Sequence, residues 1–146
     1  MSTMTMQEAS RRTGLSGLTL RYYEEVGLIG PIARADSSGH RRYTEHDVDD
    51  LLALACLRAM GVGIEDMRTY QNNRARGAVA ATEQWDLLLR HAVRIEAEME
   101  TLKVHLEYLR AKAALWDARA IGDADDEMRA NSRVQQVLPK LAAVLR

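Results

Sequence analysis

The sequence predicts a mostly α-helical protein, in which a winged helix-turn-helix domain is followed by a long coiled-coil helix and a short C-terminal helix. Three observations support this fold class. Alanine and leucine dominate the apolar residues, with no phenylalanine and only 5% aromatic residues, which favours helices over a β-sandwich. Two short helical patterns flank a glycine-containing turn near the N-terminus. A strict heptad repeat of apolar residues occupies the second half of the chain.

Composition limits the classes of protein to which the chain can belong. With 146 residues, 47% of them hydrophobic, it is long enough for one small domain with an extension and too apolar to be wholly disordered. A single cysteine excludes a disulfide framework and a cysteine-rich metal site. No stretch has the pattern of a signal peptide or the length of a membrane span, so we expect a cytoplasmic protein with no membrane partner.

Two helices and a tight turn are expected first. Residues 6–12 have a helical pattern, which Gly14 is suited to end. Ser16 is a typical N-cap for a second helix over residues 17–26, which Gly27 closes. This order is that of a helix-turn-helix, whose second helix enters the major groove of DNA.

The wing and two further helices complete the predicted DNA-binding domain, residues 1–76. Residues 30–43 hold two short extended arms around an Asp-Ser-Ser-Gly turn, which predicts a β-hairpin wing. Thr44 is a suitable N-cap for a third helix that runs to Gly61. A fourth helix is expected over residues 64–76, before Gly77.

A coiled-coil helix is predicted over residues 78–120, with an unbroken a/d repeat that is about 42 Å long at 1.5 Å per residue. Such a seam is too long to be hidden in a monomer of this size and predicts a homodimer, although it could instead pack on the N-terminal helices as ordinary core. Residues 121–146 are expected to form an acidic linker and a helix over 132–145. The predicted dimer interface consists of Leu88, Ala92, Ile95, Met99, Leu102, Leu106, Leu109, Ala113 and Trp116.

The distribution of charge points to nucleic acid, although the net charge is only −1. Arginine supplies 17 of the 20 basic residues, and no lysine precedes Lys103. Residues 1–43 hold six arginines against four acidic residues. The planar guanidinium group suits phosphate oxygens and guanine edges, so this segment is suited to bind double-stranded DNA.

The N-terminal half resembles the DNA-binding domain of the MerR family of transcriptional regulators. The motifs that carry this resemblance lie within residues 4–70. The segment LRYYE comes first, the dipeptide GL and a proline follow it, and the pattern Gly-x-Arg-x-Tyr lies in the predicted wing. The resemblance implies a homodimer, joined by an antiparallel coiled coil, that binds a palindromic promoter, works with RNA polymerase and distorts the promoter when an effector binds. His40 departs from the pattern, because the family usually has an aromatic residue there.

Helix-turn-helix geometry and this resemblance select the candidate DNA contacts. Arg21 suits guanine or phosphate, and one of the two neighbouring tyrosines is expected to face inward, unless both do. On the wing, alternation places Arg41 and Tyr43 on one face and Arg42 on the other, and the resemblance makes Arg41 the phosphate contact. The candidates are Ser16, Thr19, Arg21, Tyr22, Tyr23, His40, Arg41, Arg42 and Tyr43.

Cys56 has two interpretations. It lies at an apolar helical position, where a free cysteine is usually a small buried hydrophobe. The family's aldehyde-responsive branch has a cysteine at the matching place, which makes Cys56 a candidate sensor of an electrophile or another small-molecule effector. No metal or cofactor is expected, because the cysteines of the metal-responsive branch are missing. His91 and His105 also lie about 21 Å apart along one helix.

Two other classes of function fit the sequence less well. A helical adaptor that uses only its coiled coil would not need the arginines and tyrosines that cluster on the second helix and the wing. An enzyme is not expected, because no nucleophile with a base and no paired carboxylates occur. The sequence therefore favours a DNA-binding transcriptional regulator.

Overall fold

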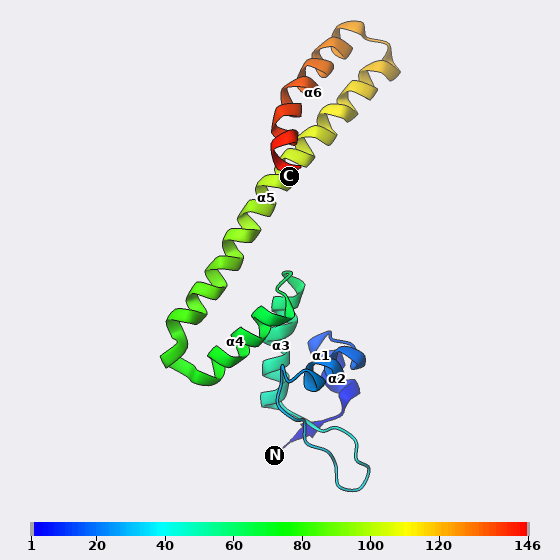
Figure 1. Ribbon diagram of the computed structural model, residues 1–146. Coiled ribbons are helices and arrows are strands. Elements are labelled where there is room, and N and C mark those ends of the chain that lie inside the picture. Colours follow the sequence, from blue (N-terminus) through cyan, green and yellow to red (C-terminus); the bar gives the residue numbers. More distant parts are fainter. Residues whose placement is uncertain (1, 146) are drawn as a thin grey trace. The chain divides into compact units, whose positions relative to one another are not determined.

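The computed structural model describes residues 2–145 and divides into two units, residues 1–89 and 90–146 (Figure 1). Both units are helical. The described residues contain two short strands, β1 (Thr3–Met4) and β2 (Tyr43–Thr44), which pair antiparallel with Met4 opposite Tyr43. The mostly helical fold class predicted from the composition is confirmed.

The first unit begins with the expected helix-turn-helix, formed by α1 (Met6–Thr13) and α2 (Gly17–Glu25). Each helix has a side-chain cap, since the hydroxyls of Thr5 and Ser16 accept hydrogen bonds from backbone N–H groups three residues later. Gly14 ends α1 with φ of 75°, a left-handed conformation that strains residues with a side chain. The turn between the two helices therefore depends on this glycine.

Helix α3 (Glu45–Ala59) supplies much of the core of this unit. Thr44 and Asp47 form a reciprocal capping box at its start, with N–H to oxygen distances of 2.8 and 3.1 Å. The buried positions are Val48, Leu51, Leu54 and Leu57. Cys56 lies off this face and is exposed, so the interpretation of Cys56 as a buried hydrophobe is wrong.

The start of α5 (Ala81–Ile121) is fixed to α4 (Ile64–Arg76) after a short 3-10 turn, η1 (Gly77–Ala80). Buried Asn73 donates to the side-chain oxygen of Gln84 at 3.2 Å. The amide nitrogen of Gln84 donates in turn to the carbonyl of Tyr70 at 3.1 Å. These two bonds hold the first turn of α5 against α4.

The second unit is a helical hairpin of α5 and α6 (Ala124–Val144), which run antiparallel (Figure 1). Its core is small, because alanines on both helices allow close approach. Two ion pairs flank it, Arg119 with Glu127 at 2.8 Å and Lys140 with Glu107 at 3.2 Å. The buried residues of this core are Ala111, Leu115, Ala130 and Val134.

The acidic linker predicted after residue 120 is wrong. Helix α6 begins at Ala124, and Asp123 caps it by accepting hydrogen bonds from the backbone N–H groups of Asp125 and Asp126, both at 3.1 Å. Acidic residues in the first turn of a helix interact favourably with its dipole. The run that resembled a linker is therefore a helix start, and Pro139 lies inside the helix that follows.

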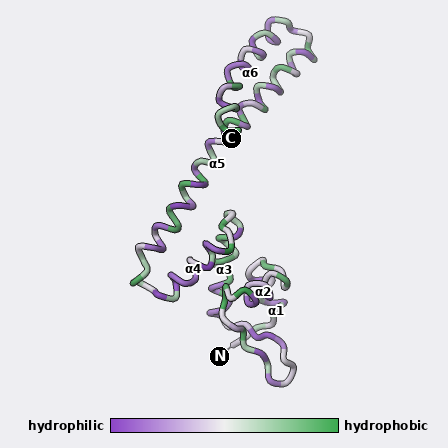
Figure 2. Tube along the Cα trace, in the orientation of Figure 1, coloured by the Kyte–Doolittle hydropathy of each residue, from purple (hydrophilic) through white to green (hydrophobic). Residues whose placement is uncertain are grey.

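Helix α5 has two apolar faces in its second half. Ala111 and Leu115 pack against α6 and are buried. The predicted seam lies on other positions and is open, with Leu102 and Leu109 each 63% exposed. Figure 2 shows the mixture of hydrophobic and hydrophilic residues along this helix. No helix formed by residues 2–145 is both long and apolar enough to cross a bilayer.

Candidate nucleic-acid interface

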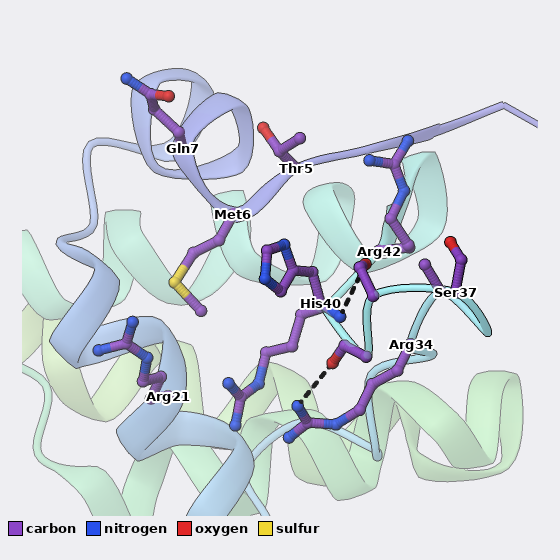
Figure 3. Close-up of a pocket in the computed structure, with 12 residues that line it drawn as sticks. Thr5, Met6, Gln7, Arg21, Arg34, Ser37, His40 and Arg42 are labelled. Carbon is purple, nitrogen blue, oxygen red and sulfur yellow. Dashed lines mark hydrogen bonds between the residues drawn. The ribbon is translucent and has the colours of Figure 1, made fainter.

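A cationic groove of about 580 Å³ lies where α1, α2 and the wing meet (Figure 3). Its lining combines Thr5 to Gln7 at the start of α1, Arg21 of α2, and residues of the wing. None of the lining residues is acidic, although Glu24, which lies outside the lining, pairs with Arg41. The charged residues and the histidine that line it are Arg21, Arg34, His40, Arg41 and Arg42.

The wing is a hairpin-like loop with little regular strand. Its arms are joined by an isolated bridge between Arg34 and Arg41, by the bond from the Arg42 N–H to the carbonyl of Ala33, and by a turn that ends at Gly39 with φ of 71°. This agrees with the extended arms and the tight turn expected from the sequence. The turn residues carry short polar side chains, so the backbone of the wing tip is accessible.

Glu24 fastens the wing to α2. One of its carboxylate oxygens accepts a hydrogen bond from Nε of Arg41 at 2.6 Å, and the other accepts from the backbone N–H of Ile32 at 3.0 Å. Burial opposes ionisation of this carboxyl, but the two hydrogen bonds outweigh it and lower the pKa of Glu24. Arg41 is therefore held by a neighbour, and we regard it as a residue that positions the wing. Sequence reasoning missed Glu24, for which the only signal was its place in the LRYYE motif, one helical turn after Arg21.

The other arginines of the groove differ in the hydrogen bonds that they make. Arg42 is tied to β1, since its guanidinium group donates to the hydroxyl of Thr3 at 3.1 Å and to the carbonyl of Thr3 at 3.2 Å. Arg34 donates to the carbonyl of Gly39 within the wing (Figure 3). Arg21 makes no hydrogen bond or ion pair with another described residue, so its guanidinium group is free to bind a ligand.

Helix α2 divides into a buried and an exposed face. Leu20 and Tyr23 are buried, whereas Leu18, Arg21 and Tyr22 are exposed. Leu18 has 76% of its surface exposed and was not among the residues selected from the sequence. This open face begins at the N-terminal end of α2, where a recognition helix contacts base edges.

Two predicted DNA contacts belong to the core. Tyr43 is fully buried and Tyr23 is only 3% exposed, and burial raises the pKa of both phenols. Their rings lie in the core because each falls on the inward face of its element. This corrects their place among the DNA contacts, while Tyr22, with 48% of its surface exposed, keeps the role expected of one of the two neighbouring tyrosines.

The hydroxyls of Ser16 and Thr19 both take part in hydrogen bonds at the N-cap of α2. The hydroxyl of Ser16 accepts from the N–H of Thr19 at 3.1 Å and donates to the hydroxyl of Thr19 at 3.0 Å. The proton of the Thr19 hydroxyl stays available to a further acceptor. The imidazole of His40 makes no hydrogen bond to another residue within 2–145 and lies in the groove (Figure 3).

A helix-turn-helix with a wing and a cationic groove between them defines the class of winged helix-turn-helix DNA-binding regulators. Comparison with known proteins identifies the family. Residues 4–74 match the model of the MerR HTH family of regulatory proteins. An uncharacterized HTH-type transcriptional regulator of Haemophilus influenzae is 30% identical over 121 residues, which cover 82% of this chain and 89% of the relative.

Two further comparisons agree with this match. The regulator CueR of Vibrio cholerae is 36% identical over 111 residues, which cover 71% of this chain and 76% of that protein. The crystal structure of HiNmlR, described as a MerR family regulator that lacks the sensor domain and is bound to promoter DNA, superposes with a TM-score of 0.70. It is 28% identical in sequence and covers 93% of this chain and 96% of that chain.

The chain therefore belongs to the MerR family of transcriptional regulators. This confirms the resemblance seen in its LRYYE and wing motifs. These relatives are transcriptional regulators and not enzymes, in agreement with the class of function expected from the sequence.

Proposed function

We propose that this regulator binds a palindromic promoter as a homodimer in the cytoplasm, with α2 in the major groove and the wing against the flanking phosphates. The cationic groove carries this proposal, because it joins Arg21, which is unpaired within the described chain, to a wing that Glu24 and Thr3 hold in place. Helix N-termini and arginines are common partners of DNA phosphates. The bound promoter of HiNmlR supports the same use of the matching domain.

The open seam of α5 supports the homodimer. Six of its large apolar members are 44% to 63% exposed in the single chain, which is costly unless a second copy covers them. A palindromic site would match a dimer with a two-fold axis, since each recognition helix then meets one half-site. The members that we propose to lie in the interface are Leu88, Ala92, Ile95, Met99, Leu102, Leu106, Leu109, Ala113 and Trp116.

An effector is proposed to act on this dimer and, through distortion of the promoter, on RNA polymerase. HiNmlR, which is 28% identical to this chain, is described as a regulator that lacks the sensor domain. This description supports a signal that acts on the DNA-binding domain or the coiled coil. Cys56 is exposed on α3, so its thiol is accessible to a small electrophile.

Binding of the full chain to a fragment of its own promoter tests the proposal. We expect fluorescence anisotropy to show tight binding that weakens with salt, because binding to phosphates releases counterions. Arg21→Ala should lower the log–log slope of affinity against salt by about 0.9 for each phosphate that the variant no longer neutralises. Arg129→Ala, a change at an exposed ion pair of the hairpin, is the matched control and should leave the slope unchanged. No salt-dependent binding by the wild type would contradict the proposal.

A further inference from the structure

Leu18 is an unusual residue for a surface. Its side chain is 76% exposed, more than any other large apolar side chain described on α1 to α4. It lies one residue after the start of α2, on a helix that has a well-formed core face of its own. Contact of a leucine side chain with water is unfavourable. Its place at the tip of α2 therefore points to a contact that forms only in a complex.

The neighbours of Leu18 indicate the chemistry of that complex. Residues three and four positions apart share one face of a helix, which places Leu18 beside Arg21 and Tyr22. All three are exposed, and Arg21 has no hydrogen-bond or ion-pair partner among the described residues. Its guanidinium group lines the cationic groove on one side of the leucine. The ligand of this face is therefore anionic overall and offers a local apolar group.

Other side chains at this end of α2 have less freedom to reach the ligand. Gly17 has no side chain, and a Cβ placed there would come within 3.3 Å of the sulfur of Met6. Ser16 uses its hydroxyl to cap the helix, and Thr19 is half-buried. Leu18 is thus the side chain at the tip of α2 with both reach and freedom.

We propose that Leu18 recognises the C5-methyl group of a thymine in the major groove of each half-site. The inference rests on the proposed DNA-binding function and gives it a base preference. Thymine is the base that presents an apolar group on its major-groove edge, and an apolar side chain is the natural partner of that methyl group. The contact removes both groups from water, while Arg21 binds the charged backbone or a guanine nearby.

A protein partner is the other kind of ligand for an exposed leucine. The surroundings favour DNA, because a protein patch that covered Leu18 would also cover the guanidinium group of Arg21 and would have to supply an acid for it. DNA supplies the anion and the apolar group together. Replacement of single methyl groups in the DNA decides between the two ligands.

The test replaces thymine by deoxyuridine, which removes the methyl group alone. A binding site is first selected from random DNA of about 30 base pairs, long enough for two half-sites one turn apart, with the full wild-type chain. Each thymine pair related by the two-fold axis is then replaced in turn. At one pair we expect the affinity of the wild type to fall about fourfold for each methyl group removed. Leu18→Ala should bind the thymine and deoxyuridine sites equally at that pair, because the side chain that senses the methyl group is gone.

Two variants serve as controls. Leu18→Met keeps an apolar side chain of similar length and should keep the preference for thymine. Leu52→Ala removes a leucine that is also exposed, on α3, and should leave the preference as in the wild type. Circular dichroism of Leu18→Ala shows whether the helices are intact.

The inference is overturned if the wild type binds its selected site but no replacement weakens binding more in the wild type than in Leu18→Ala. An equal loss in both proteins would mean that the methyl group acts on DNA shape, and not through Leu18. Failure of the wild type to select any DNA is a different result, which contradicts the proposed function and, with it, the DNA contact of Leu18.

Discussion

Glu24 shows how one carboxylate can organise a binding surface without touching the ligand. Its two oxygens hold separate arms of the wing, through Arg41 and the backbone of Ile32. Both members of the ion pair are mostly shielded, with 15% and 21% of their side chains exposed. Shielding strengthens such a pair and raises the cost of leaving either charge alone. We therefore expect Glu24 to influence both stability and DNA binding.

Glu24→Gln should lower the free energy of unfolding at pH 7 by about 1–3 kcal/mol, because a partly buried charge-assisted hydrogen bond is weakened. The pKa of Glu24 is lowered, so its ionised form stabilises the fold above pH 4.5, the usual pKa of a glutamate, and this contribution is lost as the pH falls further. The gap between variant and wild type should then shrink below pH 4.5. Urea unfolding at several pH values measures it, and a gap independent of pH would contradict the assignment.

Cys56 is the residue whose role can be separated most cleanly from DNA binding. It is exposed on α3 and does not line the cationic groove. Cys56→Ala should therefore bind the promoter with an affinity within about twofold of the wild type, as is usual for surface substitutions. In a reporter assay it should lose induction by aldehydes, because the sulfur nucleophile that would attack them is gone. Cys56→Ser is the matched control for side-chain size, and normal induction of either variant would point to a non-covalent effector.

Residue-level features differ in how far sequence could predict them. Ser16 and Thr44 were expected as helix caps and act as caps, because this role depends only on residues nearby in the chain. The pairing of Glu24 with Arg41 depends on how the wing folds back onto α2. Neither the spacing of the two residues in the sequence nor their helix propensity predicts it. Leu18 suits a helix as any leucine does, so the sequence gives no sign of its role. Only the exposure of its side chain in the structure distinguishes it from the leucines of the core.

At the scale of elements, the sequence predicted α1 to α4 closely and failed at the start of α6. A run of Gly122 followed by aspartates is typical of a linker, and the same residues are typical of a helix start. In the second arrangement Ala130 is part of the helix and packs against α5, in the same small core as Val134. Tertiary packing, which periodicity alone does not show, decides between the two.

Val134→Asp tests whether that packing holds α6 in place. A buried, unpaired carboxylate costs several kcal/mol, which we expect to exceed what this small core contributes. Hydrogen exchange followed by mass spectrometry should then show loss of protection over residues 124–144, with residues 1–89 unchanged because they have a separate core. Gln135→Asp places the same charge on the exposed neighbour and should keep the protection. Full protection of α6 in Val134→Asp would contradict the hairpin.

At the scale of the whole molecule, the heptad repeat could be predicted from the sequence, whereas its partner could not. The large side chains of the seam are exposed on α5, and the homodimer that would cover them stays a prediction. The second apolar face of α5, occupied by α6, was hidden in the same helix, because alanines at its positions give a weak periodic signal. A helix with two apolar faces can hold a hairpin and a dimer together.

The double variant Leu102→Asp, Leu106→Asp places two charges in the centre of the seam and should yield monomers, since desolvating them would cost several kcal/mol per chain. Light scattering measures the mass, and promoter binding should be lost along with the dimer. Glu96→Asp with Glu100→Asp alters two acidic residues beside the seam without adding charge and should stay dimeric. A dimeric Leu102→Asp, Leu106→Asp variant would show that another surface joins the subunits.

We predict that the two seam helices of this dimer run antiparallel. An antiparallel seam would place Leu102 beside Leu106 of the partner subunit, whereas a parallel one would place each residue beside its own copy. Disulfides form only between Cα atoms about 4.4–6.8 Å apart. In a Cys56→Ala background, the double variant Leu102→Cys, Leu106→Cys should therefore oxidise to covalent dimers on a non-reducing gel, while neither single variant should. In the antiparallel arrangement two copies of position 102 are separated by about 6 Å along the helix axis in addition to the distance between helices. Efficient linking of a single variant would mean that the helices run parallel.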